Sequence, residues 1–301
     1  MTGRFIAAQG SPILTRYDVA RLAWNAVPAV ASNRRTALQR GVNQSSAIYN
    51  QLEQALQESG LLRKILPKES TSAFALPGAS VSDTRTIACA IDRFCYVSHL
   101  SAMEFHTLTD RMPEQLYLTT PSDRSWAYQA IAQMKKDFGL SYETFLASRW
   151  PRLRYVPITR LNGQPVHTSR SSQLGAFRVV AESRFRVATI GRTYLDMIRT
   201  PAQCGGLHHV IDAYLESAEQ HLRLIIDEFE QHASPIDKIR AGFILTELKS
   251  VSDPRVDAWA RFAKRGGSRK LDASAEFESR FSERWSLSIN TELPVEWMPS
   301  T

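Results

Sequence analysis

Proline and glycine divide the first 80 residues into short segments, and this spacing constrains the fold more than any other feature of the chain. Thr15–Asp18 has the spacing of a helix-capping box, and apolar side chains follow it at helical intervals (Val19, Leu22, Ala23 and Ala26). The region of Pro28 ends this helix, because proline lacks a backbone donor. A short second helix is expected to run to Arg40 and to stop at Gly41.

A third helix and two short apolar runs complete this segment. Residues Asn43–Ser46 offer caps for the helix, Gly60 ends it, and its expected buried stripe is Ile48, Leu52, Ala55 and Leu56. The runs Leu61–Leu66 and Ala73–Leu76 flank the polar turn Pro67–Ser72, a pattern typical of a β-hairpin. Three helices followed by a hairpin predict a winged helix-turn-helix over residues 1–80, with a boundary at Pro77–Ser80.

The remaining residues, 81–301, mix helical and strand-like patterns. Helices are expected at Thr84–Ile91, Ser98–Thr107 and Ser125–Phe138, and helical patterns dominate from Arg192 to about Lys264. Strands are expected at Gln115–Thr120, Leu153–Val156 and Ala176–Val180, with a closing strand at Trp285–Ile289. The fold class predicted is α+β: an N-terminal winged helix-turn-helix followed by a larger mixed α/β domain.

Composition indicates a soluble globular protein. Of the 301 residues 43% are apolar and 22% charged, and no stretch approaches the roughly 20 apolar residues that a membrane helix needs. The segment Met1–Ile6 lacks an apolar core of signal-peptide length. Three cysteines are too few for a disulfide framework. We therefore expect a cytoplasmic protein without a membrane partner.

The positive charge is concentrated in two blocks. Residues 1–80 carry nine Lys or Arg against four Asp or Glu, and residues 149–199 carry ten Arg against two acidic residues. The rest of the chain is neutral to acidic. A basic block attracts polyanions, of which a nucleic-acid backbone is the usual one, although ordinary surface charge remains an alternative.

The third helix is the candidate for reading a DNA duplex, because the second helix of a helix-turn-helix motif lies in the major groove. With its apolar stripe turned inward, side chains near its start can reach base edges (Gln44, Ser45, Ser46, Tyr49 and Asn50). Cations around the helix are expected to bind phosphates (Arg34, Arg35, Arg40, Lys64 and Lys68). The alternative is a winged helix that binds protein.

The second basic block contains a candidate basic face. In a strand, Arg152 and Arg154 would point to one side, as would Arg184 and Arg186, and Arg178 lies in another strand-like run. The guanidinium group matches phosphate with a planar fork of donors. Alternatively, some of these arginines pair with Glu182, Asp196 or the acidic last third of the chain.

Several segments resemble a known family. They are Tyr96–Asp110 with its SHLSA sequence, Met112–Pro121, Arg186–Leu207 ending in CGGL, and Arg284–Asn290. Together with Gly60–Arg63 and Phe74–Pro77, they are similar to the AbiEi family, the antitoxins of type IV toxin–antitoxin systems. The resemblance spans nearly the whole chain.

The resemblance implies an autorepressor that binds inverted repeats in the promoter of its own operon. It also implies a C-terminal antitoxin domain that counteracts a nucleotidyltransferase toxin without a stable complex. Inverted repeats would place a homodimer on the DNA, with modules about one helical turn apart. The alternative is a stand-alone winged-helix regulator whose second domain senses a ligand or oligomerises.

A nucleic-acid-modifying enzyme is the third hypothesis, and the motifs argue against it. The chain has no phosphate-binding glycine-rich loop and no nucleophile elbow. Cys95, His99 and His106 would leave a zinc ion short of a fourth ligand, so we expect no metal and no cofactor. We expect His99 to pack at a helix start, and Asp227, Glu228 and Glu230 to form a solvated helix face.

Overall fold

The computed structural model describes residues 12–26, 42–66, 73–78, 82–181, 183–263, 269–294 and 296–297. These residues form a mixed α/β structure that divides into two compact units. Unit 1 comprises residues 1–95, 119–173 and 180–185, and unit 2 comprises residues 96–118, 174–179 and 186–301. This division differs from the expected one at residue 80.

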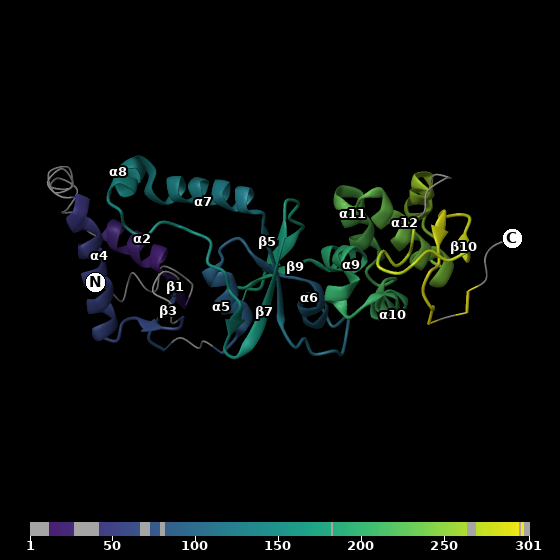
Figure 1. Cartoon of the computed structure of the whole chain (residues 1–301), viewed down its shortest axis with the longest axis horizontal. Coiled ribbons are helices and arrows are strands. Elements are labelled where there is room, and N and C mark those ends of the chain that lie inside the picture. Colours follow the sequence, from purple (N-terminus) through teal and green to yellow (C-terminus); the bar gives the residue numbers. More distant parts are fainter. Residues whose placement is uncertain are drawn as a thin grey trace. The chain divides into compact units, whose positions relative to one another are not determined.

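Unit 1 begins with a small sheet and two helices. Strand β1 (Ile13–Thr15) leads directly into α2 (Arg16–Ala26), where Asp18 Oδ2 accepts from the backbone N–H of Thr15 at 3.0 Å. Helix α4 (Val42–Glu58) follows, and then β2 (Arg63–Lys64) and β3 (Ala73–Ala75). The sheet is antiparallel in the order β1-β3-β2. Figure 1 labels β1 and β3 of this sheet near α2 and α4. The expected hairpin pairing is confirmed, whereas its turn and the expected second helix lie outside the described residues.

Helix α4 is rotated relative to the sequence expectation. Ile48, expected in the buried stripe, is 55% exposed, and Ala55 is also exposed. Tyr49 is instead buried, at 1% exposure, and its hydroxyl donates to the backbone oxygen of Arg16 at 3.1 Å. The helix ends as predicted, because Gly60 adopts a left-handed φ of 73° that suits glycine.

The hydrophobic core of this region extends beyond residue 80. Helix α7 (Asp123–Phe138) ends at Gly139, as predicted, and passes through the short turn η2 (Gly139–Ser141) into α8 (Tyr142–Ala147). The Trp24 ring of α2 packs edge-on against Phe145 and Trp150, with centroids 5.4 Å apart in both cases. Phe138 stacks on Phe145 at 3.8 Å. The first two described helices therefore share one core with α7 and α8.

The rest of unit 1 is a helix and a group of strands. Helix α5 has the predicted bounds (Thr84–Ile91), with Asp83 as its N-cap. Strands β6 (Arg160–Leu161) and β7 (Gln164–Ser171) form an antiparallel hairpin, and β7 lies beside the second half of β5 (Leu116–Pro121). The expected strand at Leu153–Val156 is wrong: this segment lies outside the sheet, although Leu153 is buried between the exposed Arg152 and Arg154.

Unit 2 contains a separate group of strands. Strand β4 (Tyr96–Val97) lies between the first half of β5 and β9 (Arg186–Ala188), which pairs antiparallel with β8 (Phe177–Val179). Helix α6 (His99–Phe105) follows β4 directly, with Ser98 as its N-cap. Tyr96 stacks on Phe177 with ring centroids 5.4 Å apart, and its hydroxyl accepts from the backbone N–H of Gly175.

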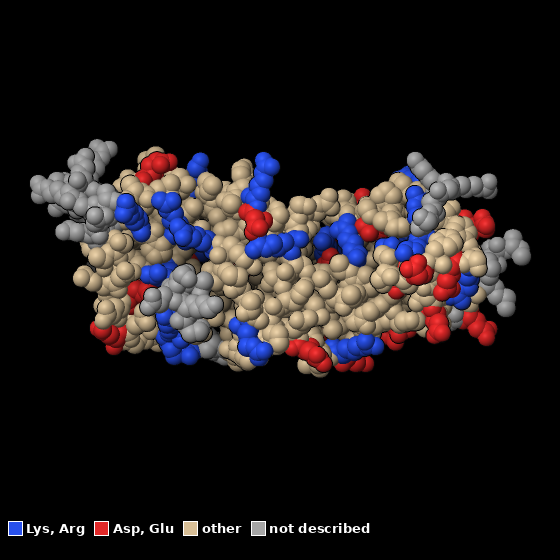
Figure 2. Space-filling model, in the orientation of Figure 1, with Lys and Arg blue, Asp and Glu red and all other residues tan. Residues whose placement is uncertain are grey.

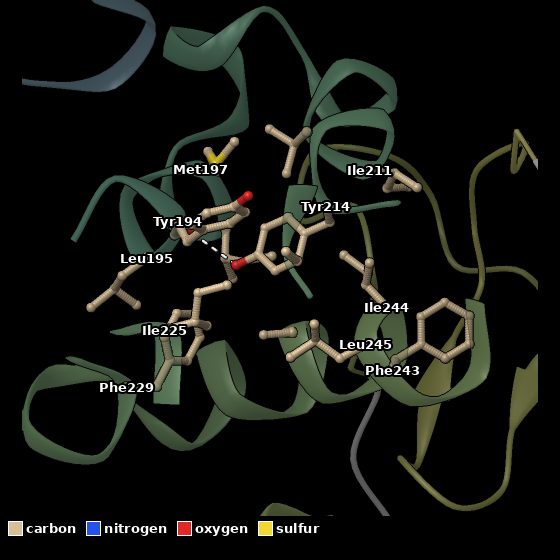
Figure 3. Packing of buried hydrophobic residues seen from close by; sticks show 14 of the residues in the cluster. Tyr194, Leu195, Met197, Ile211, Tyr214, Ile225, Phe229, Phe243, Ile244 and Leu245 are labelled. Atoms are coloured by element: carbon tan, nitrogen blue, oxygen red, sulfur yellow. Dashed lines mark hydrogen bonds between the residues drawn. The ribbon is translucent and has the colours of Figure 1, made fainter. Parts of the chain in front are cut away.

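Four further helices pack around the largest buried cluster of the described residues. They are α9 (Ile190–Arg199), α10 (Leu207–Ser217), α11 (Leu222–His232) and α12 (Pro235–Phe243). Figure 3 shows Tyr194 and Tyr214 at the centre of this cluster, where the Tyr214 hydroxyl donates to the backbone oxygen of Tyr194 at 2.9 Å. Gly191 permits the close approach of α9 to α11, since a Cβ there would lie 2.2 Å from the Leu224 backbone oxygen.

The last described segments cover this helical core. The short turn η3 (Pro201–Cys204) links α9 to α10, and a π-helical turn η4 (Ile244–Leu248) extends α12. Then α13 (Pro254–Asp257), η5 (Ala258–Phe262), β10 (Phe281–Ser282) and β11 (Leu287–Ser288) follow. The closing strand was predicted. In the part of the chain that the structure describes, no helix has both the length and the apolar character required to cross a membrane.

Candidate nucleic-acid interface

The contact between α2 and α4 positions the start of the candidate reading helix. Arg16 donates from Nε to Glu53 Oε2 at 2.7 Å and from Nη2 to Asn50 Oδ1 at 3.0 Å. Its guanidinium carbon lies 5.1 Å from the centroid of the Tyr49 ring. Burial opposes the charge of Arg16, but the hydrogen bond and the charge of Glu53 outweigh burial and raise the pKa of this guanidinium.

The predicted base-reading residues are distributed over different environments. Asn50 is exposed and Ser46 is half-buried. Tyr49 is buried, with its ring centroid 5.7 Å from that of Trp150. Burial raises the pKa of its hydroxyl far above the ordinary value. Gln44 and Ser45 belong to α4, but their side chains lie outside the described residues.

Among the predicted phosphate contacts, the structure describes Lys64. Its side chain is exposed on β2, next to the exposed Arg63. The other predicted cations, Arg34, Arg35, Arg40 and Lys68, lie outside the described residues. The exposed side of α4 also carries Gln51 and Gln54, which the sequence reasoning missed because the helix was placed in the wrong rotation.

A cavity of about 530 Å³ lies between α4 and the chain that follows α8. Its wall includes Ser46, Tyr49 and Asn50 from α4, together with Thr15, Arg16 and Tyr17. The opposite wall is residues 149–154, whose sequence is Arg-Trp-Pro-Arg-Leu-Arg. Four of the lining side chains are arginines and none is acidic, which gives this cavity a strongly positive potential.

The arginines of residues 149–154 are exposed at this cavity. Arg152 donates to the backbone oxygen of Leu146 at 2.9 Å, and Arg154 is exposed beside the buried Leu153. Arg149 adopts a left-handed φ of 57°, which is uncommon for a residue other than glycine. In Figure 2, Lys and Arg side chains gather on the part of unit 1 where Figure 1 places α2 and the chain after α8.

The residues of the expected second basic face are divided between the two units. Arg152, Arg154 and Arg184 belong to unit 1, whereas Arg178 and Arg186 belong to unit 2. Arg178 pairs with Val187 across the β8–β9 ladder, and Arg186 pairs with Val179, so these two arginines lie on opposite faces of the ladder.

Arg184 also departs from the expected alternation. It precedes β9 in a left-handed conformation with a φ of 57°. Arg178 lies over the ring of Phe105, with the guanidinium carbon 5.5 Å from the ring centroid. The alternation with buried neighbours holds for Phe185 and Val187, which are 1% and 0% exposed.

The histidines occupy the structural positions expected from the sequence. His99 is buried at the start of α6, with Nδ1 2.8 Å from Ser98 Oγ. His106 Nε2 lies 2.7 Å from the backbone oxygen of Ala188, and burial lowers the pKa of this imidazole. Within the described residues, no group of three or more His, Cys, Asp or Glu side chains is placed to bind a metal ion.

The expectation of a solvated acidic face on α11 is wrong for one of its three residues. Glu228, expected on a solvated face, is 7% exposed and lies 3.9 Å from the buried Arg192. Arg192 also donates from Nε to Asp196 Oδ1 at 2.8 Å, within α9. The sequence signal was the i, i+4 spacing of Arg192 and Asp196, whereas the approach of Glu228 depends on tertiary packing.

Comparisons with known proteins give structural similarity and no family match. No protein-family model matches the chain, and no curated protein matches it. Among solved structures, the chain is similar to the crystal structure of the Rv2827c protein from Mycobacterium tuberculosis, at 14% sequence identity and a TM-score of 0.48. The similarity covers 95% of this chain and 89% of that one.

Proposed function

We propose that this protein is a DNA-binding repressor whose N-terminal winged helix-turn-helix reads promoter DNA with α4. The observation that carries the proposal is the arrangement of α2, α4 and the antiparallel β1-β3-β2 sheet, with the β2–β3 hairpin following α4 directly. That order of helices, followed by a hairpin, is the one expected for a winged helix. Without the fold, a basic N-terminal block would support only a generic affinity for polyanions.

The exposed chemistry of α4 suits base reading. Asn50, Gln51 and Gln54 expose amide groups, and an amide can pair with adenine through two hydrogen bonds in the major groove. Arg63 and Lys64 are exposed on the hairpin, where a wing would meet phosphates. The helix thus supplies selectivity and the hairpin supplies charge.

The antitoxin half of the proposal rests on the resemblance of the sequence to the AbiEi family. In this proposal the protein represses its own operon by binding inverted repeats as a homodimer. It counteracts a nucleotidyltransferase toxin encoded beside it, without a stable complex with that toxin. The protein performs both tasks in the cytoplasm, without catalysis or a cofactor of its own.

DNA binding is tested by titrating the full chain with its operon promoter at several salt concentrations. Lys64→Ala is expected to weaken binding to all sequences equally and to lower the salt slope by about 1, because one phosphate contact is lost. Gln51→Ala is expected to relax the preference for the promoter over unrelated duplex DNA. Arg223→Ala is the matched control, since this arginine of α11 is 86% exposed and outside the proposed interface.

If the wild-type protein binds promoter DNA and unrelated DNA with equal affinity, the proposed repressor function is refuted. The antitoxin role is tested separately, by co-expressing the full chain with the neighbouring toxin. Survival of the cells without co-purification of the two proteins is expected, and cell death would refute this role while leaving DNA binding intact.

A ligand-responsive regulator without a toxin partner is the second candidate function. The cavity beside α4 favours it, because its volume lies in the range of small-molecule sites and three α4 side chains, Ser46, Tyr49 and Asn50, line it. Absence of a nucleotidyltransferase gene beside the coding sequence would favour this candidate over the antitoxin.

A further inference from the structure

Strand β8 lies at the end of the strand order in unit 2. Among the strands that the structure describes, β9 is the one that pairs with it, in an antiparallel register that places Arg178 opposite Val187. All three residues of β8 are exposed. The side of β8 that faces away from β9 is therefore an open sheet edge, which we call the β8 edge.

The backbone groups of Phe177 and Val179 point outward at the β8 edge. In an antiparallel pair, alternate residues of a strand direct their N–H and C=O groups toward the neighbouring strand. The backbone oxygen of Ala176 accepts from the N–H of Thr189 at 3.0 Å, so Ala176 and Arg178 face β9. The donors and acceptors of Phe177 and Val179 consequently face away from β9, where another extended chain can pair with them.

The side chains of Phe177 and Val179 form an apolar strip along this edge. They are 43% and 60% exposed and lie on the same face of the β8–β9 ladder, because they are two positions apart. The Tyr96 ring stacks on Phe177 with centroids 5.4 Å apart and holds it in place. A chain that adds a strand here gains main-chain hydrogen bonds and apolar contacts at alternate positions.

The charge of Arg178 selects among the chains that could pair with the β8 edge. Its guanidinium carbon lies 5.5 Å from the centroid of the Phe105 ring, on the opposite face from Phe177 and Val179. A second copy of this protein, paired symmetrically about Arg178, would place two arginines opposite each other, and like charges in that position are destabilising. An acidic side chain opposite Arg178 is favourable instead.

We propose that the β8 edge binds an extended segment of another protein, which adds an antiparallel strand to β8 and carries an acidic residue between two apolar ones. The acidic residue lies opposite Arg178, and the apolar residues pack on Phe177 and Val179. This binding does not rest on the proposed repressor function, because β8 belongs to unit 2 and α4 belongs to unit 1.

The test is fluorescence anisotropy of the full chain with labelled synthetic peptides at low salt. A peptide with the centre Val-Glu-Val is expected to bind about tenfold more tightly than the same peptide with Val-Lys-Val. Methylation of both valine amides removes the donors that face β8, so this peptide is expected to lose binding. The proposal is overturned if the Glu and Lys peptides bind equally, if methylation has no effect, or if no peptide binds at millimolar concentration.

Two substitutions at Val179 separate the backbone from the side chain. Val179→Pro removes the outward N–H and leaves the bonds to β9 intact, a position at which edge strands tolerate proline. Its affinity for the Glu peptide is expected to fall by about tenfold. Val179→Thr keeps the N–H and the β-branched shape, so its affinity is expected to stay within about threefold of the wild type. Equal affinity of Val179→Pro and Val179→Thr would refute the added strand.

Arg178→Glu tests the charge without relying on proline. This variant is expected to prefer the Lys peptide over the Glu peptide, the reverse of the wild type. An unchanged preference would overturn the role of Arg178 and with it the proposal.

Sedimentation of the wild type and Val179→Pro distinguishes a foreign segment from a second copy. The two proteins are expected to have the same oligomeric state. A wild-type dimer that Val179→Pro dissociates would show that the β8 edge takes a second copy, contrary to the proposal. Val179→Pro is expected to bind promoter DNA as the wild type does, so loss of peptide binding and loss of DNA binding are distinguishable.

Discussion

Arg16 of α2 and Glu53 of α4 form an ion pair at 2.7 Å, and their side chains are 26% and 14% exposed. The pair joins the two helices at the point where Asn50 also accepts a hydrogen bond from Arg16. It therefore sets the position of α4 relative to α2. The rotation of α4, with Tyr49 inside and Ile48 outside, follows from contacts of this kind rather than from its apolar pattern.

Arg16→Met is expected to lower the free energy of unfolding by about 1–2 kcal/mol, because it leaves the partly buried Glu53 without its cation. A double-mutant cycle with Glu53→Gln, followed by urea unfolding, measures the coupling between the two side chains. The exposed pair Arg223 and Asp227, 3.8 Å apart, provides the control, for which a coupling below about 0.5 kcal/mol is expected. Equal coupling in both pairs would contradict the structural role of Arg16.

Gly242→Ala is expected to destabilise the helical core of unit 2 by about 1–3 kcal/mol. A Cβ at this position would lie 2.2 Å from the Trp285 ring, which is fully buried. Trp285 also donates from Nε1 to Thr246 Oγ1 at 3.1 Å, so the ring has little freedom to move. Thermal unfolding measures the loss.

Trp285→Phe, which places a smaller ring at this position, is the control for the contact between residue 242 and the Trp285 ring. If the clash is the cause, Gly242→Ala should cost less in the Trp285→Phe background than in the wild type. An unchanged cost would mean that the loss arises from α12 itself rather than from the ring.

Arg192→Met is expected to cost about 3–5 kcal/mol of stability, because it strips two buried carboxylates of their cation. The side chains of Arg192, Asp196 and Glu228 are 5%, 4% and 7% exposed. Restoring neutrality with Asp196→Asn and Glu228→Gln in the same chain should recover part of the loss. Denaturant unfolding of the single and triple variants measures this recovery. A triple variant that is no more stable than Arg192→Met would argue against an electrostatic cause of the loss.

The free energy of unfolding is expected to fall as the pH drops below 6.5, the ordinary pKa of histidine. His106 is expected to contribute to this loss. Burial lowers the pKa of His106, so the unfolded chain binds a proton more readily than the folded one and acid favours unfolding. The contribution is fully present above pH 6.5 and is lost as the pH falls through the lowered value of the folded state.

The pH prediction is checked with His106→Gln, whose side-chain amide can still donate to the Ala188 backbone oxygen. Unfolding free energies at pH 7.5 and 5.5 should differ less in this variant than in the wild type. The same difference in both proteins would show that other groups carry the acid sensitivity.

The helices of the chain were largely predictable from the sequence, whereas their faces and partners were not. The sequence pattern sufficed for the bounds of α5 and for the end of α7. In the structure Asp83 caps the former, and Gly139 ends the latter at a φ of 50°. Capping and termination depend on residues within a few positions of each other, so the sequence displays them directly.

The rotation of α4 was missed because its cause lies far along the chain. Tyr49 is buried by Trp150, some hundred positions away, and by the backbone of Arg16. The sequence around Tyr49 does not reveal that its hydroxyl has a buried acceptor, the backbone oxygen of Arg16. For the same reason the sequence indicated a basic block at residues 149–199 but could not show that its residues 149–154 face α4 across a cavity.

The strand expected at Leu153–Val156 illustrates a different limit. Exposure does alternate over residues 152–154, with Leu153 buried between exposed Arg152 and Arg154. An extended chain alternates its side chains whether or not a neighbouring strand accepts its hydrogen bonds. Periodicity therefore gave the orientation of the arginines correctly but assigned them to a sheet that does not include them.

The two units alternate along the sequence, and this has a practical consequence for the preparation of fragments of the protein. The polypeptide passes from one unit to the other after Cys95, Leu118, Gln173, Val179 and Phe185. A fragment cut at residue 80 would take α2 away from Phe138 and Phe145, leaving apolar rings on both pieces without their packing partners. Gene truncation would thus yield aggregation-prone products, and point substitutions in the intact polypeptide are the means by which its activities can be separated.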